Sequence, residues 1–289
     1  MSKTAKPDRV IGIDWSGAVS LPQIFVAEIC GPKVTRVTKA KDRSAVERFL
    51  LGEPLEPNRN WANEHVPPPA DGETVHVGMD FAFGFPASLR LKGDRAWTWD
   101  DLANWCREAD SADRLEDFIN TDRTRSHFRL SGRDPADQLL FRETEDVASA
   151  SRPRSVFDLH GQGQVGRGSI RGIAMLRVLR DRGVRVWPFD EVGPAGTITV
   201  AEVFPTLALT EVGAKTEAPT RIRQIRTWEQ SLGLRFEEHA RDLTIGSDDA
   251  LDAVAAAITA TKLVSSSRGT LPRAAIDREG WILGVDPQK

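Results

Sequence analysis

The sequence predicts an α/β protein whose sheet begins with three antiparallel strands, and three patterns in its 289 residues lead to that prediction. Short apolar runs with strand character recur along the chain, and amphipathic helical stretches lie between the later runs. A Gly-Pro pair at residues 31–32 joins two early strands as the turn of a hairpin would. The hydrophobic share of 40% is enough to build a substantial core. Because no repeat or clear linker divides the chain, we expect one domain over residues 1–289.

The first part of the chain is expected to be mainly strand. In the predicted strand at 9–14, residues 10–13 are all apolar and are followed by Asp14, which is typical of a buried strand. Gly52 ends a short helical stretch, and the proline-rich residues 54–71 are expected to form a loop. The predicted elements are, in order, strands at 9–14, 23–30 and 34–37, a helix at 44–51 and a strand at 74–80.

The second part is expected to alternate helices with short strands, after a cap or insertion at about residues 95–155 that is rich in arginine and acids. The clearest helix is predicted to start at Ser169 and to end at Gly183, because apolar residues recur at helical spacing between them. The predicted elements are a helix at 97–109, a helix at 169–182, strands at 184–189 and 197–203, and helices at 221–232 and 248–263.

Charge and cysteine content limit the classes of function. The 39 basic and 42 acidic residues nearly cancel, so no chain-wide positive field holds nucleic acid or an anionic membrane, and any phosphate binding must be local. The two cysteines, Cys30 and Cys106, together with the lack of a secretory segment or a long apolar run, favour a cytoplasmic protein without a membrane partner. Trp97, Trp99 and Trp105 fit either core positions or a surface that stacks bases.

Single acidic residues end three of the predicted strands. These are Asp14, Asp80 and Glu202, and the predicted C-terminal helix adds Asp249 and Asp252, which are spaced to lie on one helix face. If the strands are neighbours, the acids meet at one edge of the sheet. Each like-charged pair at about 4 Å then costs roughly 4 kcal/mol at an effective dielectric constant near 20. The pattern therefore predicts a bound Mg²⁺ or Mn²⁺, since both ions prefer hard oxygen ligands.

Each acid also has a simpler interpretation. A single carboxylate at a strand end is commonly a turn former or a helix cap. Asp248 and Asp249 follow Ser247 at the start of a predicted helix, where negative charge complements the helix dipole. Asp252 lies deeper in an apolar stretch and is harder to explain in this way. We therefore give more weight to the joint pattern than to any one residue.

A glycine-rich segment supports two further interpretations. Residues 161–166 satisfy the dinucleotide fingerprint G-x-G-x-x-G, and Asp190 follows at the distance expected of a ribose-binding acid. The preceding stretch 155–159 is a poor strand, which weighs against this role. Alternatively, backbone N–H groups at the expected helix start, with Arg167 and Arg171 beside them, form a site for a phosphate. A tight loop closed by glycines and an N-cap explains the segment equally well.

Six motifs follow one another along the chain: Gly12–Gly17, Asp80–Pro86, Gly163–Gly172, Trp187–Asp190, Glu202–Pro205 and Asp248–Ala253. Together they resemble domain-of-unknown-function family 429, which is described as predicted nucleases. The order of the acids also resembles the ribonuclease H-like superfamily, so the resemblance implies a mixed sheet with antiparallel first strands, parallel later strands and flanking helices.

The resemblance also implies roles for these residues. Asp14 would bridge two Mg²⁺ or Mn²⁺ ions in a two-metal reaction, and the catalytic and metal-binding set would be completed by Asp80, Glu202, Asp249 and Asp252. Asp80 and Glu202 compete for one position in that set, and the sequence leaves the choice open. The expected substrate-binding residues are Ser16, Gly17, Arg167, Ser169 and Arg171.

The sequence thus predicts a metal-dependent phosphodiester hydrolase, a nuclease that acts on nucleic acid or a nucleotide. One alternative is a non-catalytic protein that binds nucleic acid or nucleotides on the same fold. A phosphotransferase is a further alternative, because kinases on a similar fold also open with an Asp-containing glycine-rich turn, but it would need a duplicated domain of greater total length, and the chain shows one such turn.

Overall fold

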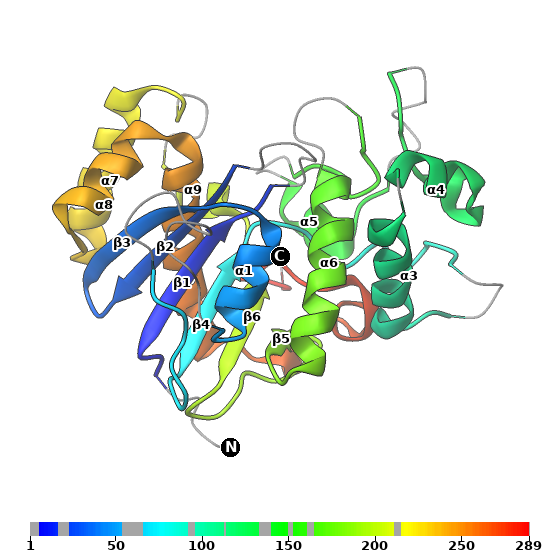
Figure 1. The fold of residues 1–289 in the computed structure, drawn as a ribbon, viewed down its shortest axis with the longest axis horizontal. Helices are drawn as coiled ribbons and strands as arrows, with labels where there is room; N and C mark the ends of the chain where they lie inside the picture. Colours follow the sequence, from blue (N-terminus) through cyan, green and yellow to red (C-terminus); the bar gives the residue numbers. More distant parts are fainter. Residues whose placement is uncertain are drawn as a thin grey trace.

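A mixed seven-stranded sheet lies at the centre of the computed structural model, which describes residues 6–16, 23–53, 66–91, 96–112, 114–132, 140–149, 153–160, 165–210 and 215–288 (Figure 1). The strand order is β5-β6-β4-β1-β2-β3-β7. Strands β1, β2 and β3 pair antiparallel, and the other pairs are parallel. The strands are β1 (Arg9–Asp14), β2 (Ile24–Cys30), β3 (Lys33–Ala40), β4 (Val75–Met79), β5 (Arg185–Trp187), β6 (Ile198–Glu202) and β7 (Arg235–Phe236). The prediction of an α/β protein with an antiparallel start is confirmed.

Helices cover both faces of this sheet. The helices α1 and α6 lie on one face, and α9 lies on the other (Figure 1). The α-helices are α1 (Arg43–Leu50), α3 (Trp99–Ser111), α4 (Leu115–Thr121), α5 (Glu143–Val147), α6 (Val165–Asp181), α7 (Ala218–Leu232), α8 (Glu238–Gly246) and α9 (Asp248–Ala260). Short 3₁₀ turns are η1 (Arg123–His127), η3 (Pro205–Ala208), η4 (Thr261–Ser265) and η5 (Arg268–Thr270), and η6 (Ala275–Glu279) is a π-helical turn.

Most predicted elements are found, but the start of one helix was predicted wrongly. Helix α6 begins at Val165, so Ser169 is not its N-cap. Gly166 and Gly168 belong to the helix, and Gly166 allows a close approach, because a Cβ there would clash with the carbonyl oxygen of Val156. The strand β7 and the helix α8 were not predicted.

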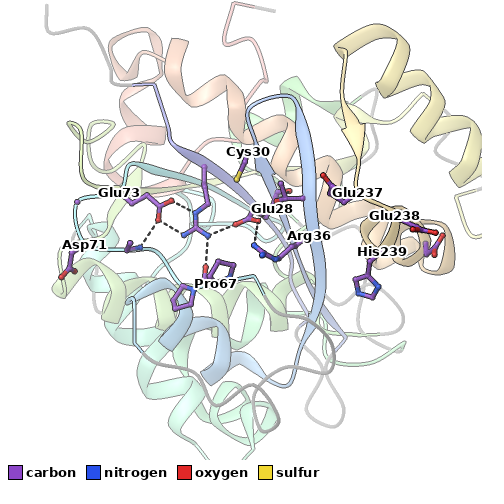
Figure 2. A pocket seen from close by; sticks show the side chains of 15 residues that line it. Glu28, Cys30, Arg36, Pro67, Asp71, Glu73, Glu237, Glu238 and His239 are labelled. Atoms are coloured by element: carbon purple, nitrogen blue, oxygen red, sulfur yellow. Dashed lines mark hydrogen bonds and ion pairs between the residues drawn. The ribbon is translucent and has the colours of Figure 1, made fainter.

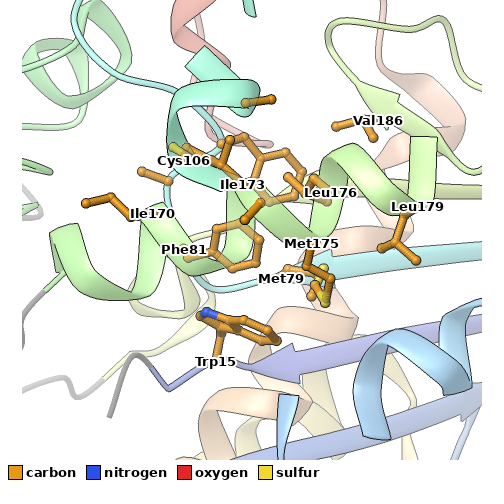
Figure 3. Packing of buried hydrophobic residues seen from close by; sticks show 14 of the residues in the cluster. Trp15, Met79, Phe81, Cys106, Ile170, Ile173, Met175, Leu176, Leu179 and Val186 are labelled. Carbon is orange, nitrogen blue, oxygen red and sulfur yellow. The ribbon is translucent and has the colours of Figure 1, made fainter. Parts of the chain in front are cut away.

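The face covered by α1 and α6 holds the largest hydrophobic cluster. Figure 3 shows Trp15, Met79 and Phe81 packed against Ile170 and Ile173 of α6. The Trp15 indole N–H also donates a hydrogen bond to the Gly168 carbonyl, at 3.0 Å. This contact links Trp15, which directly follows β1, to the first turns of α6.

Glycines on the opposite face let α9 pack directly on the strands. A Cβ on Gly12 of β1 would overlap the backbone of α9 at Ala253, and a Cβ on Gly78 of β4 would lie 2.6 Å from the Ala256 carbonyl oxygen. Side chains alternate between the faces of a strand, so a residue two positions after each glycine also faces α9. Those residues are acidic, and they form the site described below.

The region expected to be a cap contributes to the main core. Trp97, Trp99 and Trp105 are 2–4% exposed, so the core interpretation is confirmed and a base-stacking surface is excluded for them. Helix α3 packs against α6. Whether residues 95–155 form an insertion, and whether residues 1–289 form one domain, stay predictions. Among the described residues, no helix combines the length and the apolar character needed to cross a membrane.

Candidate carboxylate site

Three aspartates from distant parts of the chain meet where β1 and β4 end. Asp14 is the last residue of β1, and Asp80 follows β4 and donates its N–H to the Ile13 carbonyl, at 3.0 Å. Asp252 lies in α9, directly before the residue that covers Gly12. The strand register and the close packing of α9 therefore bring the three carboxyl groups within reach of one another's charge, as the pKa shifts below indicate.

Burial and mutual repulsion raise the pKa of each of these carboxyl groups. Burial, followed by the charges of Asp252 and Asp80, raises the pKa of Asp14 well above its usual range. Burial and Asp252 raise the pKa of Asp80 to about 8. Burial raises the pKa of Asp252 to about 6, although a nearby lysine opposes that shift. Asp249 is half-buried in the first turn of α9, and burial raises its pKa as well. The cluster therefore favours bound protons or cations.

The opposing lysine is Lys215, which the sequence analysis did not single out. Its Nζ forms an ion pair with Oδ2 of Asp252, and its charge also lowers the pKa values of Asp14 and Asp80. The backbone of Lys215 is held by Arg221, whose Nη1 donates to the Lys215 carbonyl at 2.8 Å. Since Lys215 lies in a connecting segment before α7 and 37 positions from Asp252, no periodic pattern links the two residues.

One fully buried oxygen of the cluster has no hydrogen-bond partner among the described residues. It is Oδ1 of Asp252, a residue only 6% exposed. Leaving a buried polar atom unpaired typically costs about 1–3 kcal/mol, and more for a charged group. An oxygen of this kind, together with donors that are all carboxylates, fits a hard divalent cation. In the present arrangement, however, no three His, Cys, Asp or Glu side chains of the described residues are grouped to hold one ion.

Glu202, the other acid that competed with Asp80, lies in a different environment. It pairs in register with Met79, one position before Asp80, so its side chain belongs to the opposite face of the sheet. The Arg142 guanidinium contacts both of its carboxylate oxygens, with Nη1 at 2.7 Å from Oε2, and the Phe83 N–H donates to Oε2 at 2.9 Å. The charge of Glu202 is thus balanced inside the protein.

Arg142 connects this second acid to further parts of the chain. The arginine is 1% exposed and also bonds to Glu145 of α5, with Nη2 at 2.9 Å from Oε1, and to the Glu279 carbonyl at 2.9 Å. The guanidinium of Arg142 and the carboxylates of Glu145 and Glu202 therefore form a buried network of charge-assisted hydrogen bonds. Glu202 therefore has a structural explanation that Asp80 lacks.

The predicted substrate-binding residues differ in exposure and in their contacts. Ser169 is fully buried and its Oγ accepts a hydrogen bond from the Ala82 N–H at 3.2 Å, so it is not exposed to a ligand. Ser16 is half-buried beside Asp14, and its carbonyl oxygen lies 3.5 Å from Arg43 Nη1. Gly17 lies outside the described residues.

Three arginines, Arg43 of α1 and Arg167 and Arg171 of α6, lie near one another on the helices of the face of the sheet opposite α9. Arg167 forms an ion pair with Glu116, and Arg171 Nε lies 3.3 Å from a carboxylate oxygen of Asp110. Burial and the charge of Arg171 lower the pKa values of both Arg43 and Arg167, so the three arginines are close to one another. Arg43 was not predicted. Its contact with the Ser16 carbonyl places this positive cluster beside the end of β1.

The dinucleotide interpretation gains no support. Residues 155–159 do not form a strand, although Asp158 makes a single bridge. Asp190 accepts hydrogen bonds from the Arg180 side chain and, at 3.0 Å, from the Val186 N–H. Both of its carboxylate oxygens therefore already have hydrogen-bond partners within the protein. Residues 161–164 of the glycine-rich segment lie outside the described residues.

A cavity of about 1190 Å³ lies at the other end of β1 (Figure 2). Arg9 donates to both carboxylate oxygens of Glu73, to Glu28 and to the Pro67 carbonyl, at 2.6–2.9 Å. With a rise of about 3.3 Å per residue, the length of β1 separates this cavity from Asp14 by roughly 16 Å. The charged groups at its wall mainly satisfy each other, so we do not assign it to the candidate site.

Comparison of the chain with protein-family models, with curated proteins and with solved structures gave no significant match. The motif resemblance described above therefore stays a prediction.

Proposed function

We propose that the protein is a divalent-cation-dependent phosphodiester hydrolase, of nuclease type, in which Asp14, Asp80 and Asp252 hold the cation. One observation carries this proposal: the carboxyl groups of Asp14, Asp80 and Asp252 converge from the ends of two strands and from a helix, and among the described residues their neighbouring cation is Lys215 while one buried oxygen, Oδ1 of Asp252, has no hydrogen-bond partner. Buried charges of one sign need a counter-charge, and a metal ion is a common solution. Asp249, at the outer end of the cluster, is an additional ligand in this proposal.

The arrangement of the acids also supports the proposed fold family. An aspartate in the first of three antiparallel strands, an acid after a parallel strand and acids on a late helix are the features on which the ribonuclease H-like resemblance depends. We propose Asp80 for the position that the sequence left open, because Glu202 is paired with Arg142. The motifs that resemble family 429 contain these same acids, so membership of that family is also part of the proposal.

The proposed chemistry assigns separate tasks to the acids and the arginines. A bound Mg²⁺ or Mn²⁺, or two such ions, would supply a water of lowered pKa and would neutralise charge on the phosphate. The carboxylates fix the position of the cation at the end of β1. Arg43 contacts the Ser16 carbonyl near that end of β1, and together with Arg167 and Arg171 it provides donors for the phosphate oxygens of a nucleic acid or nucleotide.

The direct test is cleavage of labelled single-stranded and double-stranded oligonucleotides with and without Mn²⁺. We expect cleavage only with the metal, and we expect D14N to lower the rate on the order of 100-fold or more, because one cation ligand is lost. The matched control is E238Q, an exposed acid of α8 near the distant cavity, which should leave the rate unchanged.

Two results would contradict the proposal. Cleavage that needs no metal, or a D14N protein as active as the wild type, would remove the role of the carboxylates. Tight Mn²⁺ binding through Asp14 without cleavage of any substrate would instead favour the non-catalytic binding protein.

A further inference from the structure

Lys215 occupies a position in the carboxylate cluster that a cation would take. Its Nζ is paired with Asp252, and its charge acts on both Asp14 and Asp80. We infer that the Lys215 ammonium group is a built-in counter-ion of these three acids, and that a divalent cation binds by displacing it. This inference rests on the proposed function, and it assigns to Lys215 a control over metal affinity.

The two partners of the ion pair differ in their freedom to move. The Asp252 side chain is 9% exposed and is carried by α9, which is packed tightly on β1 through Gly12. The Lys215 side chain is 29% exposed and has four rotatable carbon–carbon bonds. The Lys215 backbone is fixed by Arg221 at 2.8 Å. The ammonium group can therefore leave toward solvent while the acids and the lysine backbone stay in place.

The energetics favour such an exchange. A single ammonium group pairs with one oxygen, Oδ2 of Asp252, whereas three carboxyl groups meet at this point. The Oδ1 atom of Asp252 also remains without a hydrogen-bond partner among the described residues. A divalent cation brings twice the charge and accepts several oxygen ligands at once. It must compete with Lys215, however, and this competition weakens its binding.

The inference predicts an unusual result: loss of a site residue should improve metal binding. We would measure Mn²⁺ affinity of the full chain by isothermal titration calorimetry at about pH 8, in the wild type, K215M and K215R. Methionine keeps much of the apolar stem and removes the charge. We expect K215M to bind Mn²⁺ about tenfold more tightly or better, and K215R to bind no more tightly than the wild type, because arginine keeps the competing charge.

A second measurement uses the wild-type protein and so does not depend on how well the variants fold. Acetylation of lysines by an amine-reactive reagent can be followed by mass spectrometry with and without Mg²⁺. If the cation displaces Lys215, its amine becomes more accessible and its acetylation rate rises severalfold. Lys33, which is paired with Glu237 at 2.9 Å far from the cluster, is the internal control and should not change.

The outcomes separate the inference from the proposed function. If Mn²⁺ binds the wild type through Asp14, but K215M binds no more tightly and Mg²⁺ leaves the acetylation of Lys215 unchanged, then the inference is overturned and the proposed function stands. If neither the wild type nor K215M binds Mn²⁺, both are overturned. Tighter binding by K215M together with faster acetylation of Lys215 supports the inference.

Discussion

At the residue scale, Asp80 and Glu202 show how neighbouring positions in a sheet acquire different roles. Both acids stand at the end of a parallel strand; Glu202 is buried and Asp80 is half-buried. Glu202 faces the side of the sheet where Arg142 neutralises it. Asp80 faces α9, where Asp252 repels it and its pKa rises to about 8. The same residue class is therefore paired with an arginine on one face of the sheet and meets like charges on the other.

This contrast predicts opposite effects of two conservative substitutions. E202Q removes one of the two carboxylates bonded to the buried Arg142 and leaves Glu145 as its partner, so we expect a loss of stability of about 1–3 kcal/mol. D80N removes a repelled carboxylate, so we expect the metal-free protein to be as stable as the wild type or more stable at about pH 8. Urea unfolding monitored by tryptophan fluorescence measures both effects.

The Mn²⁺ response provides the control for this pair of variants. A ligand that binds only the folded state raises the unfolding free energy by about 2.7 kcal/mol at 100 times its Kd. We expect E202Q to keep this increase and D80N to lose most of it. A D80N protein that is much less stable but keeps its Mn²⁺ response would show that we have exchanged the roles of the two acids.

Part of the site could be predicted from single residues, and part could not. Asp14, Asp80 and Asp252 were predicted because each follows or lies in an apolar run where an acid is unexpected. Our proposal of Asp80 rather than Glu202 rests on the strand register and on the Arg142 pair, which the sequence does not specify. Lys215 and Arg43 were not identified, since they lie at the edges of loops and their partners are distant in sequence.

At the element scale, the site depends on how closely α9 approaches the sheet. The helix is rich in alanine, and Gly12 and Gly78 offer no side chain between it and β1 and β4. Asp252 is carried on this helix one position before Ala253, which covers Gly12. A small outward shift of α9 would therefore move Asp252 away from Asp14 and Asp80.

The substitution G12A tests this dependence. Its new Cβ would overlap the α9 backbone, which can yield only by moving the helix, so we expect a loss of stability of about 1–3 kcal/mol or more. The same shift should weaken the Mn²⁺ response. The matched control is G246A, at the end of α8, where a Cβ meets nothing within 4 Å and the effect should be small.

Thermal unfolding with and without Mn²⁺ checks both expectations. If G12A were as stable as G246A and responded equally to the metal, then the close packing of α9 on β1 would not be what positions Asp252.

The elements themselves were largely predictable, because most have clear periodicity. The helices at 44–51, 97–109 and 221–232 were found within a few residues of their predicted bounds. The predicted start of α6 was wrong because the glycines there, a residue type that usually marks a loop, lie inside the helix and allow close packing. β7 is only two residues long and exists through its pairing with β3, which gives no local signal.

At the scale of the whole molecule, the carboxylate cluster should make stability depend on pH. The folded protein keeps protons on Asp14, Asp80 and Asp252 at pH values where the unfolded chain has released them, above about pH 4. The unfolded state therefore binds fewer protons than the folded state in this window. By linkage, the free energy of unfolding then falls as the pH rises, by at most about 1.4 kcal/mol per pH unit for each proton.

We accordingly expect the metal-free protein to lose stability between about pH 5 and pH 8, because the pKa of Asp252 is raised to about 6 and that of Asp80 to about 8. Urea unfolding at a series of pH values measures this slope, and D80N should reduce it. A wild type whose stability rises across this window would indicate that the cluster is balanced by charges from elsewhere in the protein.

The central claim is that Asp14, Asp80 and Asp252 together bind a divalent cation, and anomalous diffraction from a crystal soaked in Mn²⁺ tests it most directly. The account predicts an anomalous peak within coordination distance of the carboxylates of Asp14 and Asp252, with the Lys215 ammonium group moved away. A fully soaked crystal with no peak at these carboxylates, and with Lys215 still paired to Asp252, would contradict it.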